Sequence, residues 1–158
     1  MFLEKGASLD ELDHSDSDAI DYCLLYYDYD IVLYLVEQMP KSYWKFDTIS
    51  KVIAKANDYR FIQKVMSFVD NVNLCDEKKA ILMVASQYTT DVRVVKYMLD
   101  KGADIQLKNI NEWTALMYAS RYNPNPYIVE DLILRGSDCS ANSVGLTLIM
   151  LAACNPNS

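Results

Sequence analysis

A short block of sequence recurs along the chain at a nearly constant spacing. Residues 114–119, Thr-Ala-Leu-Met-Tyr-Ala, recur at 147–152 as Thr-Leu-Ile-Met-Leu-Ala, and residues 80–85, Ala-Ile-Leu-Met-Val-Ala, precede the first block by nearly the same distance. A second block shares this offset, because Lys-Gly-Ala-Asp at 101–104 recurs as Arg-Gly-Ser-Asp at 135–138. Self-similarity at such a period is typical of repeat proteins, in which each unit packs on its neighbours. The chain is therefore predicted to fold as an array of similar units.

The composition favours helices as the content of these units. Only 4 glycines and 4 prolines occur among 158 residues, too few turn-forming residues for a sandwich or barrel of many short strands. With 51% hydrophobic and 23% charged residues, the chain has the composition of a globular protein with a buried core. A helical fold is therefore expected.

The repeated pattern resembles the ankyrin repeat. It reads Thr-x-Leu-Met-x-Ala, then an Ile-Val-x-x-Leu-Leu-like run, then Gly-Ala-Asp, with a period of about 33 residues. The resemblance is strongest over 76–153 and degenerate over 42–75, where Ser50 stands at the position expected for a core leucine. It implies an all-α ankyrin-repeat α-solenoid, in which each unit has a β-turn finger followed by two antiparallel helices. Neither helix can bury its apolar face without the neighbouring unit.

On this pattern, residues 1–158 form a single ankyrin-repeat array. The predicted units are a partial repeat at 1–12, a repeat at 13–42, a degenerate repeat at 43–74, repeats at 75–108 and 109–141, and a half repeat at 142–158. Four full repeats exceed the roughly three that a stable array needs. The half repeat has an apolar first helix and no second helix after it. This open end predicts either a piece of a longer array or self-association of the chain through the half repeat.

Residue types at the expected helix ends fit this scheme. Thr114 precedes an apolar run and is predicted to cap a first helix, and Pro126 is predicted to begin a second helix, where its missing N–H costs no hydrogen bond. Gly102 and Gly136 are predicted to end the second helices in the left-handed conformation. Glycine is absent from the equivalent positions Met39 and Val69, so those two helix ends are expected to be less regular.

Charge is distributed unevenly. The formal net charge is −7, and residues 1–40 hold ten acidic residues against one lysine. Because phosphate contacts need a basic surface, nucleic acid is not expected as a partner, whereas the acidic end is expected to attract a basic segment of a partner protein. No apolar run reaches the roughly 18 residues of a membrane span, and the N-terminus lacks the apolar stretch of a signal peptide. An intracellular, cytoplasmic protein that does not contact membranes is expected.

No group of residues predicts catalysis, a cofactor or a metal site. Asp13, His14 and Ser15 are adjacent in one turn, whereas the nucleophile and base of a hydrolase triad converge through the fold. The acidic run from Asp10 to Asp21 lacks the spacing of an EF-hand loop. A solvated acidic face is the favoured interpretation of this run, and weak cation binding is the alternative.

The four cysteines do not indicate a zinc site or a disulfide framework. They include no Cys-x-x-Cys pair, and the chain has a single histidine. Cys23 and Cys139 are expected to be small buried apolar residues, and Cys154, near the open end, is expected to react.

Surface recognition is the function that the resemblance implies. In ankyrin arrays, partners contact the finger tips and the outer part of the first helices, which line a concave groove. Trp, Tyr and Arg, the types that most often anchor interfaces, occur at these positions. Carried over by position, the predicted partner-binding residues are Asp76, Glu77, Lys79, Gln87, Tyr88, Ile110, Asn111, Trp113, Arg121 and Tyr122, with Trp44 and Tyr26 from the two earlier repeats.

The sequence thus predicts a protein-protein interaction module that is not an enzyme. The alternative is a structural spacer or assembly segment of a larger ankyrin-array protein or oligomer. A host-directed effector or a viral factor is compatible with either hypothesis, because ankyrin arrays occur in eukaryotes, bacteria and viruses.

Overall fold

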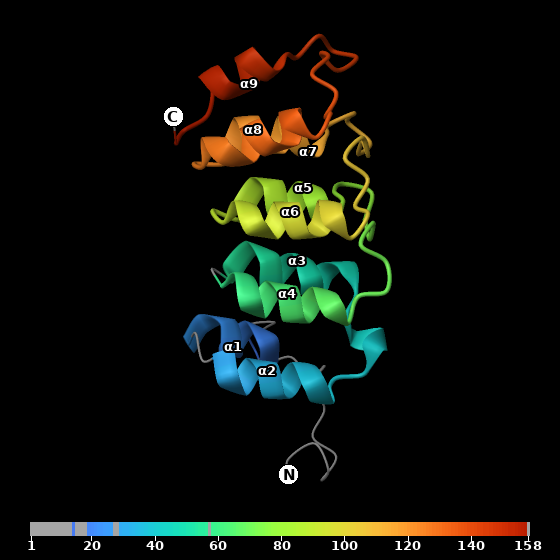
Figure 1. Ribbon diagram of the computed structural model, residues 1–158, viewed down its shortest axis with the longest axis vertical. Helices are drawn as coiled ribbons and strands as arrows, with labels where there is room; N and C mark the ends of the chain where they lie inside the picture. Colours follow the sequence, from blue (N-terminus) through green and yellow to red (C-terminus); the bar gives the residue numbers. More distant parts are fainter. Residues whose placement is uncertain (1–13, 15–18, 27–28, 57, 158) are drawn as a thin grey trace. The chain divides into compact units, whose positions relative to one another are not determined.

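The computed structural model describes residues 14, 19–26, 29–56 and 58–157. The chain divides into two compact units, an N-terminal unit at 1–40 and a C-terminal unit at 41–158. In the described part of the N-terminal unit, α1 (Ala19–Tyr26) and α2 (Tyr29–Gln38) pack against each other (Figure 1). The partial repeat expected at 1–12 lies outside the described residues.

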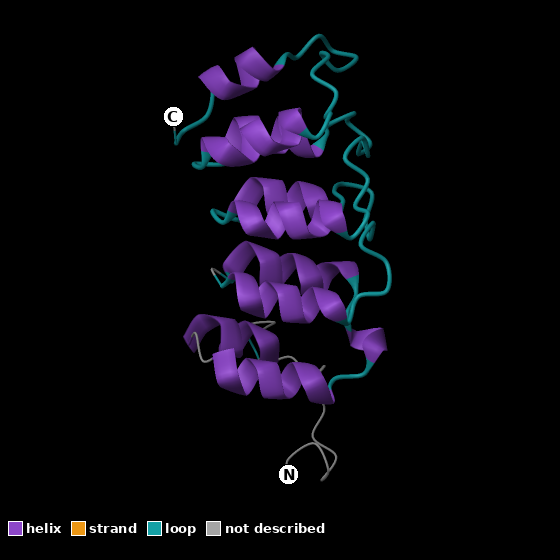
Figure 2. Ribbon diagram, in the orientation of Figure 1, coloured by secondary structure: helices purple, strands orange, loops and turns teal. Residues whose placement is uncertain are grey.

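The C-terminal unit consists of helices joined by loops (Figure 2). Its elements in chain order are a 3-10 helix (Lys41–Tyr43), α3 (Phe46–Lys55), α4 (Tyr59–Ser67), α5 (Ile81–Tyr88), α6 (Val92–Asp100), α7 (Ala115–Tyr122), α8 (Pro126–Leu134) and α9 (Leu148–Ala153). Over the part of the chain that the structure describes, the only β-type pairing is an isolated bridge between Cys75 and Ala80. The all-α fold predicted from the sequence is therefore confirmed.

Helices of the C-terminal unit form two rows. The first row consists of α3, α5, α7 and α9, each in contact with the next, and the second row consists of α4, α6 and α8 (Figure 1). Each second-row helix also contacts the first-row helix that precedes it in the sequence. Stacked pairs of this kind are the architecture of an α-solenoid.

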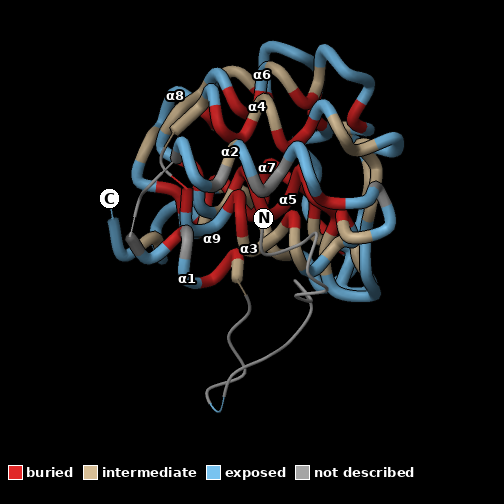
Figure 3. Tube along the Cα trace, turned by 90° about the horizontal axis from the view of Figure 1, so that it is seen from below, coloured by how far each residue is buried: buried red, intermediate tan, exposed pale blue. Residues whose placement is uncertain are grey.

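The first row is buried more deeply than the second. All residues of 81–86 in α5 and of 115–120 in α7 are buried, whereas α8 buries only Ile128 and Leu132. Figure 3 shows the exposed positions on the outer sides of α6 and α8. The middle first-row helices are thus buried over their first six residues and exposed at their last residue, Tyr88 in α5 and Tyr122 in α7. The second-row helices need only one apolar stripe.

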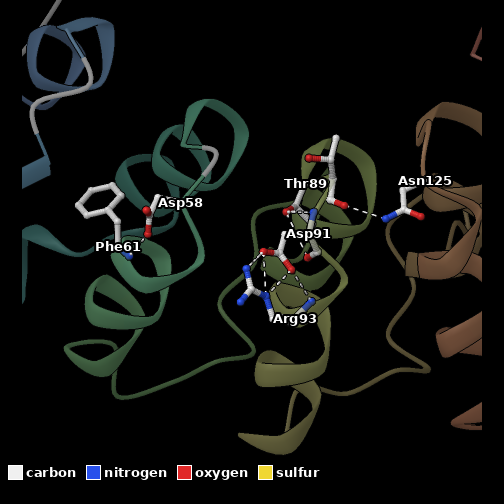
Figure 4. A network of polar contacts seen from close by, with 7 residues as sticks. Asp58, Phe61, Thr89, Asp91, Arg93 and Asn125 are labelled. Carbon is white, nitrogen blue, oxygen red and sulfur yellow. Dashed lines mark hydrogen bonds and ion pairs between the residues drawn. The ribbon is translucent and has the colours of Figure 1, made fainter.

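Side-chain caps start the helices at the predicted places. The Thr114 hydroxyl accepts a hydrogen bond from the Met117 N–H at 3.3 Å, and Pro126 is the first residue of α8. Such a cap satisfies an N–H group that has no partner within the helix. Further side-chain caps are formed at α4 by Asp58, at α6 by Asp91, at α8 by Asn125 and at α9 by Thr147 (the first three labelled in Figure 4).

Left-handed glycines end two second-row helices. The φ angle is +90° at Gly102, after α6, and +89° at Gly136, after α8. This conformation lets the chain satisfy the last carbonyl groups of a helix. Helix α4 ends without it, because Glu112 is the only described non-glycine residue with positive φ and Val69 is therefore right-handed or extended. The absence of a left-handed residue at Val69 agrees with the lack of glycine there, and the less regular end stays a prediction.

The fingers share a turn held by a polar side chain. Asp76, Asn109 and Asn142 occupy equivalent positions in successive copies of the repeat. The Asn109 Oδ1 accepts hydrogen bonds from the N–H groups of Asn111 (3.0 Å) and Trp113 (2.9 Å). The Asp76 carboxylate accepts from the N–H groups two and three residues later (2.7 and 2.6 Å), and the side-chain Oδ1 of Asn142 accepts from the N–H four residues later (2.9 Å).

Side-chain amides also connect successive loops. Asn73 donates to the Gly102 carbonyl (3.2 Å) and accepts from the Asp104 N–H (2.7 Å). Gln106, which takes the place of Asn73 in the next repeat, donates to the Gly136 carbonyl (2.7 Å) and accepts from the N–H two residues beyond it (3.1 Å). The two pairs of bonds fix the spacing of neighbouring fingers.

A second set of bonds, which we call the amide ladder, connects the loops at the opposite ends of the first-row helices. The buried Asn123 side chain donates to the carbonyls of Ser86 and Thr89, both at 2.8 Å. Asn155 repeats this pattern one unit later with the carbonyls of Ser120 (3.2 Å) and Asn123 (2.9 Å). Each rung satisfies backbone carbonyls that burial would otherwise leave without partners.

Two side chains lie elsewhere than predicted. Trp44 is only 5% exposed, edge-on to the Tyr43 ring, because the chain enters α3 from a 3-10 helix and not from a β-turn finger. Cys139 is exposed in the loop after α8 and is not a core residue. Cys154 is exposed, and its reactivity stays a prediction; the Cys23 side chain lies outside the described residues.

Candidate protein-interaction surface

Three aromatic rings contact one another on α7 and the finger before it. The Trp113 ring centroid lies 5.1 Å from that of Tyr118 and 6.2 Å from that of Tyr122, with which it is stacked at 29°. Tyr118 and Tyr122 are four residues apart on one face of α7, and their centroids are 6.2 Å apart. Tyr122 is 37% exposed and Tyr118 only 9%. The rings therefore form a supported apolar platform that remains partly open to solvent.

Lys79 connects this platform with α5. Its Nζ lies 5.0 Å from the Tyr118 ring centroid and 5.4 Å from that of Tyr88, within the range of cation-π attraction. The same Nζ donates a hydrogen bond to the Gln87 side chain. Burial lowers the pKa of Lys79, and the nearby Asp76 carboxylate partly opposes this. We call Lys79, Tyr88, Trp113, Tyr118 and Tyr122 together the aromatic surface.

Asn109 fixes the geometry of the aromatic surface. Its Oδ1 holds the Trp113 backbone, and its Nδ2 donates to the Tyr118 hydroxyl (3.2 Å) and to the Lys78 carbonyl (2.6 Å). Burial raises the pKa of Tyr118, and the Asn109 hydrogen bond acts in the opposite direction. The Tyr118 hydroxyl is thus neutral at physiological pH, and it keeps its own proton to donate.

An open pocket of about 260 Å³ lies among these rings. Asn109, Asn111, Trp113, Tyr118 and Tyr122 line it. The ring faces can receive an apolar or flat side chain, and the amides and the hydroxyl can orient it by hydrogen bonds.

Arg121 adds a positive charge at the edge of the aromatic surface. Its guanidinium carbon lies 5.1 Å from the Tyr122 ring centroid, and the group donates a hydrogen bond to the Cys154 carbonyl. Ile110, on the finger before α7, is 70% exposed. Large side chains exposed around a pocket are typical of interaction sites.

Most of the predicted partner-binding residues come together here. The aromatic surface and its direct contacts contain Lys79, Gln87, Tyr88, Asn111, Trp113, Arg121 and Tyr122. Ile110, Asp76 and Glu77 are exposed in the fingers, and the Asp76 carboxylate also holds its own turn. Trp44 is buried and does not belong to this surface, and the Tyr26 side chain lies outside the described residues. The binding role of each residue stays a prediction.

Two residues of the site were not expected from the sequence. Tyr118 occupies the position of Val84 and Leu151 in the neighbouring copies, so the pattern indicates a plain core residue. Asn109 is a finger-turn residue whose recurrence as Asn142 is a detectable signal. The hydrogen bond between Asn109 and Tyr118 joins a finger to a helix, and a pattern within one repeat does not reveal it.

Stacked helix pairs linked by hydrogen-bonded fingers define an α-solenoid. The model of a protein family described as ankyrin repeats (3 copies) matches residues 51–143, more than half of the chain. The chain therefore belongs to the ankyrin-repeat family, whose members generally mediate protein-protein interaction and are typically not enzymes. No curated protein matches the chain.

Two other kinds of feature are absent from the described residues. None of their helices has the length and apolar character needed to cross a bilayer. They contain no group of three or more His, Cys, Asp or Glu side chains placed to hold a metal ion. The acidic run at 10–21 lies largely outside the described residues, so weak cation binding there stays an alternative.

Proposed function

We propose that the chain binds a segment of a partner protein at the aromatic surface. The observation that carries this proposal is the contact of three rings around an open pocket, with Tyr122 partly exposed and Trp113 held by Asn109. Rigid aromatic side chains bury a large area on binding and lose little conformational entropy. The platform needs no rearrangement before a partner docks.

The pocket suggests the chemistry of the bound segment. An apolar or aromatic side chain fits between the rings of Trp113, Tyr118 and Tyr122. A carbonyl or carboxylate oxygen next to it would accept hydrogen bonds from the Asn111 amide and the Tyr118 hydroxyl.

The acidic N-terminal residues extend this proposal to a basic partner. Residues 1–40 hold ten acidic residues against one lysine. Such a charge imbalance speeds association with a basic segment at low ionic strength and does so less at high salt. Nucleic acid is not proposed as a partner, because the same charge repels phosphate groups.

The proposal is tested with the double variant Trp113→Ala/Tyr122→Ala. Partners are captured on immobilised chain and compared by quantitative mass spectrometry with those captured on Tyr127→Ala, an exposed aromatic of α8 outside the aromatic surface. We expect specific partners to be retained by Tyr127→Ala and reduced at least about tenfold by the double variant, the effect of losing a hot-spot pair.

Circular dichroism and thermal melting separate binding from folding. The double variant should keep its helical content and lose no more than about 1 to 2 kcal/mol of stability, because neither ring is fully buried. Unfolding of the double variant would assign both rings a structural role and contradict the proposal.

A further inference from the structure

The ammonium group of Lys79 lacks the kind of partner that other cations of the C-terminal unit have. The Arg93 guanidinium, for comparison, donates to the Asp91 carboxylate at 2.6 Å (Figure 4). Within the part of the chain that the structure describes, no carboxylate lies at ion-pair distance from the Lys79 Nζ, whose hydrogen-bond partner is the neutral Gln87 side chain. Burial lowers the pKa of Lys79, and Asp76 offsets this only in part. A carboxylate brought close to the ammonium group would therefore be stabilised by it.

The acidic residues of the same finger do not fill this place. The Asp76 Oδ1 accepts hydrogen bonds from the backbone N–H groups of Lys78 and Lys79, which fix this carboxylate in the finger turn. Glu77 is exposed, and among the described residues it forms no ion pair with Lys79. A lysine ammonium group has three donors, and the bond to Gln87 uses only one of them. Lys79 can therefore donate further hydrogen bonds to a ligand.

The neighbouring pocket offers mainly hydrogen-bond donors. Asn109 has no capacity left, because its oxygen accepts two backbone N–H groups and its amide donates to the Lys78 carbonyl and the Tyr118 hydroxyl. The Tyr118 hydroxyl accepts from Asn109 and keeps its own proton to donate, and the Trp113 indole N–H is a donor only. A ligand that suits these groups carries acceptor oxygens beside its apolar part.

Distances within the aromatic surface indicate the spacing of the ligand groups. The Trp113 ring centroid lies 5.1 Å from the Tyr118 ring centroid, and the Lys79 Nζ lies 5.0 Å from the same point. In an extended peptide, side chains two residues apart lie on one face, about 7 Å from each other. Two such side chains therefore have the spacing to reach the pocket and the ammonium group together.

We propose that the segment bound at the aromatic surface is extended and carries an aromatic residue with an Asp or Glu two positions away. The aromatic side chain enters the pocket, and the carboxylate pairs with the Lys79 ammonium group. The Tyr118 hydroxyl donates to a backbone carbonyl of the segment between them. This inference rests on the proposed function and names the chemistry of the partner segment, with Lys79 as the residue that determines specificity.

The basic stretch proposed to meet the acidic N-terminal residues belongs to another part of the partner. The net charge of −7 repels an acidic peptide at long range, and salt screens this repulsion more strongly than it screens a partly buried ion pair. Binding is therefore measured at about 0.15 M salt, where the Debye length is about 8 Å.

The first test selects a phage-displayed library of random short peptides on the immobilised full chain. Peptides that the Trp113→Ala/Tyr122→Ala variant also retains are discarded. We expect the remaining peptides to share an aromatic residue with Asp or Glu two positions away. Enrichment of aromatic peptides without this acidic residue, or with Lys or Arg in its place, would overturn the inference and leave the proposed function standing. If no enriched peptide depended on the two rings, the proposed function would fail, and the inference with it.

The second test compares an enriched peptide with its amide version, in which Gln or Asn replaces the acidic residue, by fluorescence anisotropy. The full chain should prefer the acidic peptide by about five- to tenfold, the effect of a hydrogen bond to a charged group. Lys79→Met should bind both peptides alike, because it keeps an apolar side chain and removes the charge. Lys79→Arg should retain the preference, since it keeps the charge.

Lys78→Met is the matched control, because it removes the same charge from an exposed position of the same finger and should retain the preference. A preference that persists in Lys79→Met would overturn the role of Lys79. Loss of the preference in both Lys78→Met and Lys79→Met would assign it to general charge and would also overturn that role. Circular dichroism checks that the variants fold, and Lys79→Gln replaces Lys79→Met if the latter does not.

Discussion

Two junctions of the C-terminal unit achieve the same stacking by different means. At the α5/α7 junction, the buried Asn123 side chain donates hydrogen bonds to the Ser86 carbonyl, in the last turn of α5, and to the Thr89 carbonyl just after it. At the α3/α5 junction, the residue in the place of Asn123 is Thr89, whose hydroxyl bonds within the described residues only to Asp91 of its own loop. There the buried side chains of α3, Ile49, Val52 and Ile53, supply the packing.

The comparison shows that two properties of a junction have different sources: how stable the junction is, and which relative position of its two helices is fixed. Apolar burial is not directional and tolerates small shifts between neighbouring helices, whereas an amide that binds two carbonyls fixes one relative position. The α3/α5 junction, in the degenerate part of the sequence, therefore depends mainly on side-chain volume. The α5/α7 junction depends in addition on hydrogen-bond geometry.

The largest effect is expected from Phe61→Ala in α4. Phe61 is 1% exposed and belongs to the largest fully buried side chains. Its truncation should lower the free energy of unfolding by about 3 to 5 kcal/mol. Because repeats are stabilised by their neighbours, α3 and α4 should lose amide-exchange protection before α7 and α8 do. Uniform loss of protection along the C-terminal unit would contradict this order.

Asn123→Ala should have the next largest effect. It leaves two buried carbonyls without partners, so urea denaturation should show a loss of about 2 to 4 kcal/mol. Asn155→Ala is the matched control, since it removes the same bonds at a partly exposed rung, and it should cost less than about 1.5 kcal/mol. If both variants lost the same free energy of unfolding, the contribution of an amide-ladder bond would not depend on how deeply the bond is buried.

A smaller effect is expected on acidification, at the start of α6. The hydrogen bond from the Arg93 side chain lowers the pKa of the Asp91 carboxyl, which caps this helix. A lowered carboxyl pKa contributes stability that is present above about pH 4 and is lost as the pH falls through the folded-state value. The protection factors of the amides in the first turn of α6, which compare each exchange rate with the intrinsic rate at the same pH, should therefore fall at low pH.

Helix α8 provides an internal control for this pH effect. Its cap is Asn125, which takes the place of Asp91 in the next repeat and does not titrate. The variant Asp91→Asn should keep the cap and remove the acid response of α6. Acid fraying of equal size at α6 and α8, measured by NMR hydrogen exchange, would argue against the assignment to Asp91.

The sequence predicted the features of the fold that depend on local backbone chemistry. Thr114, Pro126, Gly102 and Gly136 mark helix ends because capping and left-handed φ are properties of single residues. The buried position of Trp44 could not be predicted in this way, because it depends on the 3-10 helix that replaces a finger. The repeat pattern assumes a finger at this place.

The sequence predicted which residues belong to the candidate site better than it predicted how their side chains contact one another. Trp113, Tyr122, Tyr88 and Lys79 were expected at the partner-binding surface, since finger tips and first helices recur at fixed positions. The cluster geometry depends on Asn109 and Tyr118, which come from different elements of one repeat, and on Lys79 of the previous repeat. Contacts between repeats are set by both sequences at once, so neither copy alone reveals them.

The side-chain hydrogen bonds between repeats also bear on how fast such a chain folds. From Asn73 onwards, the bonds that cross from one repeat to the next join residues 29 to 37 positions apart, with Asn73 to Gly102 the shortest span and Asn123 to Ser86 the longest. Over the described residues from Asn73 onwards, forming these bonds therefore closes no loop much longer than one repeat. Because folding rates fall as the sequence separation of contacts rises, each added repeat should extend the folded array without slowing the closure of the others.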